Sequence, residues 1–246
     1  ALAAGDADGH GLLYAHASLL VLNEGLMRSP GYNSERDMTP VTLLMTTPFV
    51  IAARPGLPAS TLPELIAMAR ARPGQVTFAT SSATNLPRFA GEMLKRAAGV
   101  DMVNVPYASV PSAIQDTIAG RVDVMIDGTP ALIPQVRGGA MKAIALTSAE
   151  RFPTLEDIPV VAETYAGFHS VGWFGVTAPR AAPSATVTRI ANDFREVLAE
   201  PGLRERLLRD FGAKVDADGP DSFASFLSRE REKYRALIRD VGVVMD

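Results

Sequence analysis

The sequence contains no cysteine, a single tryptophan and only three histidines among its 246 residues. The absence of cysteine excludes disulfides, thiolate metal ligands and cysteine nucleophiles. The histidines, His10, His16 and His169, form no H-x-x-x-H pair of the kind that binds zinc from one helix. No apolar run is long enough to span a bilayer, and no signal peptide is visible. These absences predict a chain that holds no metal or cofactor and is not embedded in a membrane.

The composition is that of a folded globular protein. Hydrophobic residues make up 47% of the chain and charged residues 21%, which is unlike a disordered sequence. The formal net charge is −3 and the basic residues are scattered. Attraction to nucleic acid or to an anionic membrane is therefore not expected. The length suits one large domain or two of ordinary size.

The middle of the chain alternates short apolar runs with helical patterns. Strands are expected at 76–80, 102–105, 122–126 and 143–146. Helix signals separate them, including a cap at Ser109 and stops at Gly99 and Gly120, and a capping box, Thr61 to Glu64, starts a helix before the first strand. Strands that alternate with short helices indicate βαβ units and a parallel sheet.

The flanking segments have a different pattern. An apolar run at 41–53 is broken by Pro48, and its second half resembles a buried strand. A second apolar run covers 171–178, and two long amphipathic helices are expected at about 184–199 and 221–240.

Turn-rich residues at 54–58 and an irregular stretch ending near 170 bracket the central α/β block. This arrangement predicts two domains joined by two crossovers. Residues 1–54 and 171–246 would form the first lobe, and residues 55–170 would form the second.

Three of the expected strands end in turns that lead into helix N-termini, at 81–84, 107–109 and 127–129. Ligands of open parallel sheets bind beyond the carboxyl ends of the strands, and helix N-termini favour anions. The turns add the hydroxyl groups of Ser81, Ser82, Thr84, Ser109 and Thr129. Apart from Arg88, they add no basic side chain, which suits reversible binding of a small carboxylate. Each residue taken alone could equally be an ordinary helix cap.

Enzymatic signatures are weak. The turn at 80–85 contains no glycine and therefore lacks the dinucleotide-binding fingerprint. Residues 169–172 approach a nucleophile elbow, but Phe168 stands where the first glycine belongs. Asp127 could act as a general base, yet no partner residue is identifiable.

Several ordered segments together resemble the Bug or TctC-type substrate-binding proteins of tripartite tricarboxylate transporters. Residues 8–13 are similar to the family segment D-G-Y-T-L-L, and residues 37–44 to D-F-x-P-V-x-L-L. Residues 105–107 followed by 120–123 match its V-P-Y and G-x-V-D pair, and residues 173–179 resemble W-x-G-x-x-A-P. The ordered set spans nearly the whole chain and is more specific than any of its members.

The resemblance implies a two-lobed type II periplasmic binding protein fold, with each lobe a mainly parallel sheet flanked by helices. It implies no catalysis, a carboxylate ligand in an interdomain cleft that closes like a Venus flytrap, and delivery from the periplasm to the membrane permease subunits of a transporter. A monomer is expected. By position, the family's ligand contacts correspond to His16, Ala17, Ser18, Ser81, Ser82, Thr84, Tyr107 and Asp127. Ser109 is added to this set because it lies in a turn that follows an expected strand.

The chain also departs from the family pattern. The family's first strand, its Pro-Gly-Gly loop and the following helix have no counterpart in the sequence. The turn at 81–85 lacks the family's glycines, so its backbone is expected to approach a ligand less closely. His16 adds a titratable group that could select a ligand or simply fill space. A ligand-sensing domain of a regulator with the same architecture is the alternative hypothesis, and an enzyme on an α/β scaffold ranks third.

Overall fold

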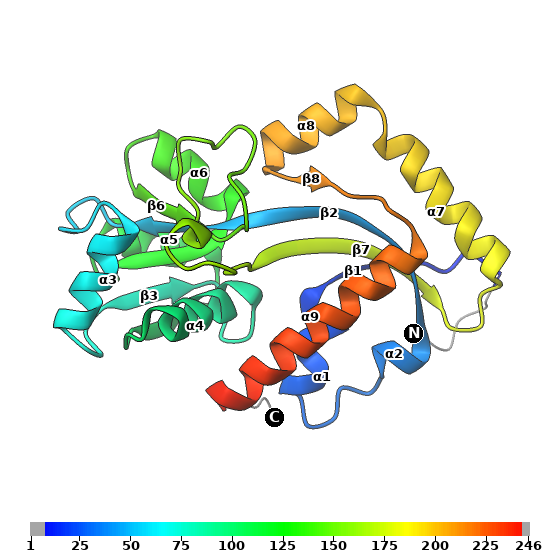
Figure 1. Cartoon of the computed structure of the whole chain (residues 1–246), viewed down its shortest axis with the longest axis horizontal. Helices are drawn as coiled ribbons and strands as arrows, with labels where there is room; N and C mark the ends of the chain where they lie inside the picture. Colours follow the sequence, from blue (N-terminus) through cyan, green and yellow to red (C-terminus); the bar gives the residue numbers. More distant parts are fainter. Residues whose placement is uncertain (1–7, 243–246) are drawn as a thin grey trace. The chain divides into compact units, whose positions relative to one another are not determined.

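The computed structural model describes residues 8–242, which form two compact units (Figure 1). Within that range, unit 1 comprises residues 8–46, 173–208 and 213–242, and unit 2 comprises residues 47–172 and 209–212. The chain passes between the units within the two long strands β2 (Met38–Ala53) and β7 (Val171–Pro179). The turn at 54–58 lies inside unit 2, where Arg54 Nε donates to Asp123 Oδ1 at 3.2 Å. Residues 209–212 enter unit 2 and leave it again, which adds two crossings to the two expected from sequence.

Unit 2 is the central α/β block. Its elements after β2 are α3 (Leu62–Ala71), β3 (Thr77–Thr80), α4 (Leu86–Ala98), β4 (Val103–Pro106), α5 (Val110–Ile118), β5 (Val124–Gly128), α6 (Thr129–Arg137), β6 (Lys142–Leu146) and the 3₁₀ turn η3 (Val161–Glu163). β3 pairs in parallel with both β4 and β5, as the βαβ pattern predicts. β2 pairs antiparallel with β5 and with β6, so this part of the sheet is mixed.

The helix boundaries in unit 2 follow from local capping. The Thr61 hydroxyl accepts from Glu64 N, and the Glu64 carboxylate accepts from Thr61 N, which completes the expected capping box. Gly99 ends α4 with a φ of 61°, a left-handed conformation that glycine adopts without steric cost. Ser109 caps α5 as expected.

Unit 1 contains the two ends of the described chain. Its elements besides β2 and β7 are β1 (Leu13–His16), the π-helical turn η2 (Ser18–Leu22), α1 (Asn23–Leu26), α2 (Ser34–Asp37), α7 (Ser184–Leu198), α8 (Pro201–Phe211, which ends in unit 2), β8 (Lys214–Val215) and α9 (Pro220–Val241). β1 pairs antiparallel with β7, and β8 pairs antiparallel with β2. The expectation of mainly parallel pairing therefore needs correction for these pairs. β1 and β8 are short strands added to the edges of the long crossing strands, without the helical crossover that makes a parallel pair.

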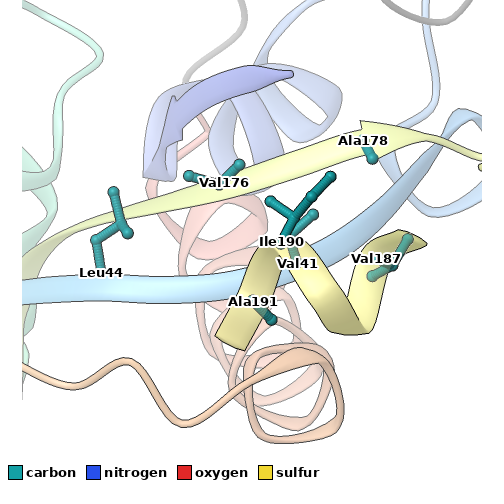
Figure 2. Packing of buried hydrophobic residues seen from close by; sticks show 7 residues of the cluster. All are labelled: Val41, Leu44, Val176, Ala178, Val187, Ile190 and Ala191. Atoms are coloured by element: carbon teal, nitrogen blue, oxygen red, sulfur yellow. The ribbon is translucent and has the colours of Figure 1, made fainter. Parts of the chain in front are cut away.

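The two long strands of unit 1 pack against α7 (Figure 2). The buried residues of this cluster are Val41 and Leu44 from β2, Val176 and Ala178 from β7, and Val187, Ile190 and Ala191 from α7. The helix members are spaced by three and four residues and the β7 members by two, so each element turns one apolar face inward. This cluster explains why the apolar runs at 41–53 and 171–178 are so prominent in the sequence.

A second core of unit 1 surrounds Trp173, which is 1% exposed. Its indole lies edge-on to Phe223 and Phe226 of α9, with ring centroids 6.0 and 5.4 Å away. Its Nε1 donates to Glu230 Oε2 at 3.1 Å. An aromatic cluster and one buried polar contact thus fix α9 against β7.

Candidate functional site

The carboxyl ends of β4, β3 and β5 lie side by side in unit 2. β3 pairs with β4 through Thr80 and Pro106, and Tyr107 N donates to Thr80 O at 2.8 Å. β3 pairs with β5 through Ala79 and Met125, so the same register places Ser81 opposite Asp127. Three residues predicted from sequence to bind ligand are therefore adjacent at one edge of the sheet.

Asp127 is the most unusual group at this edge. Its Oδ1 accepts from Gly128 N at 2.8 Å, whereas its Oδ2 is buried and accepts no hydrogen bond from the described residues. Burial raises the pKa of the Asp127 carboxyl, and the Ser81 hydroxyl and the Gly128 N–H oppose that rise. An unpartnered buried carboxyl oxygen is costly for the protein, and native structures keep few of them.

The turn between β3 and α4 is held by its own hydroxyl groups. Thr80 Oγ1 donates to Ser82 O at 2.9 Å, and Thr84 N donates to Ser82 Oγ at 3.2 Å. The Ser81 hydroxyl accepts from the amide of Asn85 at 3.0 Å, and Asn85 in turn caps α4. These contacts fix the turn without the family's glycines, and they engage part of the hydrogen-bonding capacity of Ser81, Ser82 and Thr84.

Arg88 is a further polar group at this turn, and the sequence argument left it out of the predicted contacts. Its Nη1 donates to Ala83 O at 2.5 Å, while its Nε is buried and donates to no atom of the described chain. The position was visible in the sequence as the single basic side chain near the turns. That its Nε has no partner could not be read from the sequence, because this depends on how the guanidinium packs.

Tyr107 and Ser109 use their hydroxyl groups within unit 2. Tyr107 Oη donates to Asp116 Oδ2 at 3.0 Å, and Asp116 also pairs with Arg121 at 2.7 Å. The Ser109 hydroxyl accepts from Ser112 N at 3.3 Å and shares a 2.9 Å hydrogen bond with the Ser112 hydroxyl. The hydroxyl groups of Tyr107 and Ser109 are therefore both engaged within unit 2.

We expect Ser109→Ala to lower the free energy of unfolding by about 1 kcal/mol, because the cap of α5 is lost. Ser109→Asp should retain most of that stability, since a carboxylate also caps a helix N-terminus. Urea unfolding of the two variants checks the prediction. Equal stability of Ser109→Ala and the parent protein would show that the cap contributes nothing.

Thr129, the remaining hydroxyl of the strand-end turns, is held by two protein contacts. Its Oγ1 donates to Phe211 O at 2.8 Å and lies 3.0 Å from Thr47 Oγ1. Gly212 packs so closely on it that a Cβ there would lie 2.5 Å from Thr129 Oγ1. Thr129 therefore anchors the excursion of residues 209–212, and its hydroxyl is already engaged.

The predicted contacts of unit 1 lie at the end of β1, where His16 is the last residue of the strand and Ala17 and Ser18 follow it. Ser18 N donates to His16 Nδ1 at 3.3 Å, while Ala17 is buried and immediately precedes the π-helical turn η2. Because Nδ1 accepts this bond, the neutral imidazole carries its proton on Nε2, where it can be donated. Surrounding protein lowers the pKa of His16 by displacing water from it, which favours this neutral form.

Between residues 8 and 242, no helix combines a membrane-spanning length with a sufficiently apolar sequence. Within the same range, no three His, Cys, Asp or Glu side chains gather closely enough to hold a metal ion. What the described strand edge offers a ligand is hydrogen-bonding groups, helix N-termini and one guanidinium.

Two α/β units joined through long strands define the class of two-lobed substrate-binding proteins. The chain belongs to the tripartite tricarboxylate transporter family receptors, whose family model matches residues 2–243. This is a family of binding proteins and not of enzymes. The resemblance noted in the sequence is thereby confirmed.

Individual relatives agree with this assignment. A UPF0065 protein of Bordetella bronchiseptica is 30% identical over 243 residues, which cover 99% of this chain and 72% of the relative. Protein BugT of Bordetella pertussis is 28% identical over 238 residues, covering 96% of this chain and 73% of BugT.

Solved structures show the same fold. Rpa4515 of R. palustris with adipate superposes with a TM-score of 0.87 at 27% identity, over 99% of this chain and 81% of that one. The periplasmic binding protein BugD superposes with a TM-score of 0.81 at 28% identity, over 100% of this chain and 82% of BugD. MatC from Rhodopseudomonas palustris with bound malate superposes with a TM-score of 0.78 at 26% identity, over 96% of this chain and 82% of MatC. The predicted α/β, two-lobed fold is therefore confirmed.

Proposed function

We propose that the protein is a periplasmic receptor that captures a small carboxylate and delivers it to the permease subunits of a tripartite tricarboxylate transporter. Membership of the receptor family supports the transport role. The likeness to Rpa4515 with adipate and to MatC with malate supports the ligand class. BugD, another structural neighbour, is a periplasmic binding protein, which supports the location.

The observation that carries the ligand class is the edge formed by β4, β3 and β5. β3 and β4 lead through polar turns, and β5 leads directly, into a helix N-terminus, where N–H groups and the helix dipole favour an anion. Contacts from unit 2 are proposed for Ser81, Ser82, Thr84, Tyr107, Ser109 and Asp127. Contacts from unit 1 are proposed for His16, Ala17 and Ser18.

Binding of a carboxylate is expected to stabilise the folded protein. A ligand present at 100 times its dissociation constant adds about 2.7 kcal/mol to the free energy of unfolding. For a chain of this size that corresponds to a rise in melting temperature of roughly 5–10 °C. The measurement is a thermal-shift series with straight-chain dicarboxylates of four to six carbons, followed by titration calorimetry of those that act.

Uncharged diols of the same chain lengths are the matched controls, because they keep the shape and lose the carboxylates. The diols should leave the melting temperature unchanged. If no mono- or dicarboxylate raises it, the proposed ligand class is wrong.

A further inference from the structure

A groove of about 450 Å³ runs along α9 in unit 1. α9 packs there on η2 and α1, and α2 supplies a further lining residue (Figure 1). None of the lining residues belongs to the contacts proposed for a carboxylate ligand. The lining includes Gly25, Glu35, Arg231, Glu232, Arg235 and Arg239.

The groove contains a row of three arginines. Arg231, Arg235 and Arg239 follow one another at intervals of four residues along α9. This spacing places about one arginine per turn on the same face of the helix, with successive residues about 6 Å apart along its axis. The row is therefore about 12 Å long, which suits an elongated anion better than a single compact one.

Glu35 already occupies the first interval of this row. Its Oε1 lies 3.5 Å from Arg231 Nε and accepts from Arg235 Nη2 at 3.2 Å, while its side chain remains 47% exposed. The side chain of Arg239, one turn further, forms no ion pair within residues 8–242. Glu232 also lines the groove, so three arginines face two carboxylates. The first interval thus holds a carboxylate, and the second, between Arg235 and Arg239, is open to one.

We propose that this groove docks an acidic segment of a partner protein. Carboxylates of the segment contact Arg239 and Arg235 and compete with Glu35 for the first interval. Side chains two residues apart in an extended strand lie about 7 Å apart on one face, close to the 6 Å between successive arginines. Acidic residues at every second position of an extended segment, or at every fourth position of a helix, match the row.

The permease subunits are the partner that this surface fits, and in naming them the inference rests on the proposed function. A receptor must meet its permease and leave it again in each transport cycle. Contacts between exposed charges are individually weak and are screened by salt, yet complementary charge accelerates association. An arginine row with a small excess of positive charge therefore suits a transient encounter.

The test measures binding of a fluorescein-labelled hexaglutamate peptide to the whole protein by fluorescence anisotropy. Hexaglutamate should bind at low ionic strength, and its binding should weaken as the ionic strength rises to about 0.15 M, where the Debye length falls to about 8 Å. Hexaglutamine, which has the same length without the charges, should not bind.

Two variants assign the binding to the groove. The double variant Arg235→Ala and Arg239→Ala should weaken hexaglutamate binding by about tenfold or more, since each exposed charge contact contributes up to roughly fivefold in affinity. Glu35→Gln should strengthen it by up to roughly fivefold, because a competing carboxylate is removed. A gain of affinity is not expected from a change that merely disturbs the fold.

The matched control is the double variant Arg189→Ala and Arg206→Ala. It removes the same charge from exposed positions of α7 and α8 and should bind hexaglutamate as the parent protein does. Arg231 is kept in all variants, because it donates to Leu20 O at 3.2 Å and to Ser34 Oγ at 2.9 Å and so holds η2 and α2 against α9.

Three results would overturn the inference. The first is equal binding of hexaglutamate by the parent protein and the groove double variant. The second is displacement of the peptide by equimolar citrate, which would identify a site for small anions. The third is groove-dependent binding to phosphatidylglycerol vesicles without binding of the peptide, which would identify a membrane contact.

A thermal-shift series with carboxylates on the parent protein and the groove double variant separates this inference from the proposed function. Carboxylates should raise the melting temperature of both proteins equally, because the groove contains none of the proposed ligand contacts. If they stabilise both while hexaglutamate binds neither, the docking inference alone fails. If they stabilise neither while hexaglutamate still binds through the arginines, the proposed function fails and the groove remains a docking surface.

Discussion

Replacing Gly175 by alanine is expected to lower the free energy of unfolding by about 1–3 kcal/mol, because a single added methyl group overfills the core of unit 1. A Cβ at this position would lie 2.3 Å from Cζ and 2.7 Å from Cε1 of Phe223. Phe223 is fully buried, and Trp173 and Phe226 pack on its ring, so the ring has little room to move.

Trp173 supplies the measurement, since it is the single tryptophan of the chain and lies in the affected cluster. Urea unfolding followed by its fluorescence should show a lower midpoint for Gly175→Ala than for the parent protein. The matched control is Gly202→Ala in the first turn of α8, where a Cβ meets no atom within 4 Å. That change should be neutral or stabilising by up to about 1 kcal/mol, as alanine favours helix over glycine.

The second change that tests this packing is made on the partner ring. Phe223→Leu alone should be destabilising, whereas combining it with Gly175→Ala should cost less than the sum of the two single changes. Strict additivity would show that the two positions do not compete for the same space.

This close contact also gives a physical reason for one sequence signature. In the stretch at 173–179, Trp173 packs edge-on to Phe223 and Gly175 leaves room for the same ring. The motif was recognised from sequence as part of a family pattern. The packing reason for Trp173 and Gly175 could not be deduced from the motif itself, because the Phe223 ring comes from α9, which lies far along the chain.

The local elements of unit 2 were predictable because their signals are local. Strand periodicity, the Thr61–Glu64 capping box and the stop at Gly99 each involve neighbouring residues. α8 was missed for the opposite reason. Leu203, Leu207 and Phe211 recur at helical spacing, but the segment begins with Pro201 and Gly202, which suggest a turn, and none of its residues is buried.

The long strand β2 shows where a local signal misleads. Pro48 suggested a break, yet the strand runs through it from Met38 to Ala53. Thr46 is the last residue paired with β8, and Phe49 is the first paired with β5, so Pro48 lies where β2 changes partners. A proline that lacks an N–H is tolerated at such a position.

The candidate site was predictable in outline only. Turns at strand ends and the position of Asp127 can be read from the sequence, since topology places the carboxyl ends of parallel strands together. Which polar atoms remain unpaired cannot be read from it. Ser109 and Asp127 are both polar residues at strand-end turns, but the first caps a helix and the second keeps a free buried oxygen.

Glu230→Ala is expected to be still more damaging, with a loss of about 3–4 kcal/mol in the free energy of unfolding. Glu230 is only 4% exposed, accepts from Trp173 Nε1 and forms an ion pair with Lys233. Its removal leaves the buried indole N–H without its acceptor and takes the carboxylate partner from Lys233. Glu230→Gln keeps an oxygen within reach of the indole, so it should cost clearly less than the alanine change.

The control for this prediction is an exposed ion pair, since burial is the supposed cause. Arg151 pairs with Glu163 at 2.7 Å, and both side chains are more than two-fifths exposed. Glu163→Ala should therefore cost less than about 1 kcal/mol. The fluorescence of Trp173 again reports unfolding, and the expected order of stability is Glu163→Ala, then Glu230→Gln, then Glu230→Ala. If Glu230→Ala were as stable as Glu163→Ala, the buried carboxylate would not be what fixes α9 to β7, and the aromatic contacts of Phe223 and Phe226 would have to do so alone.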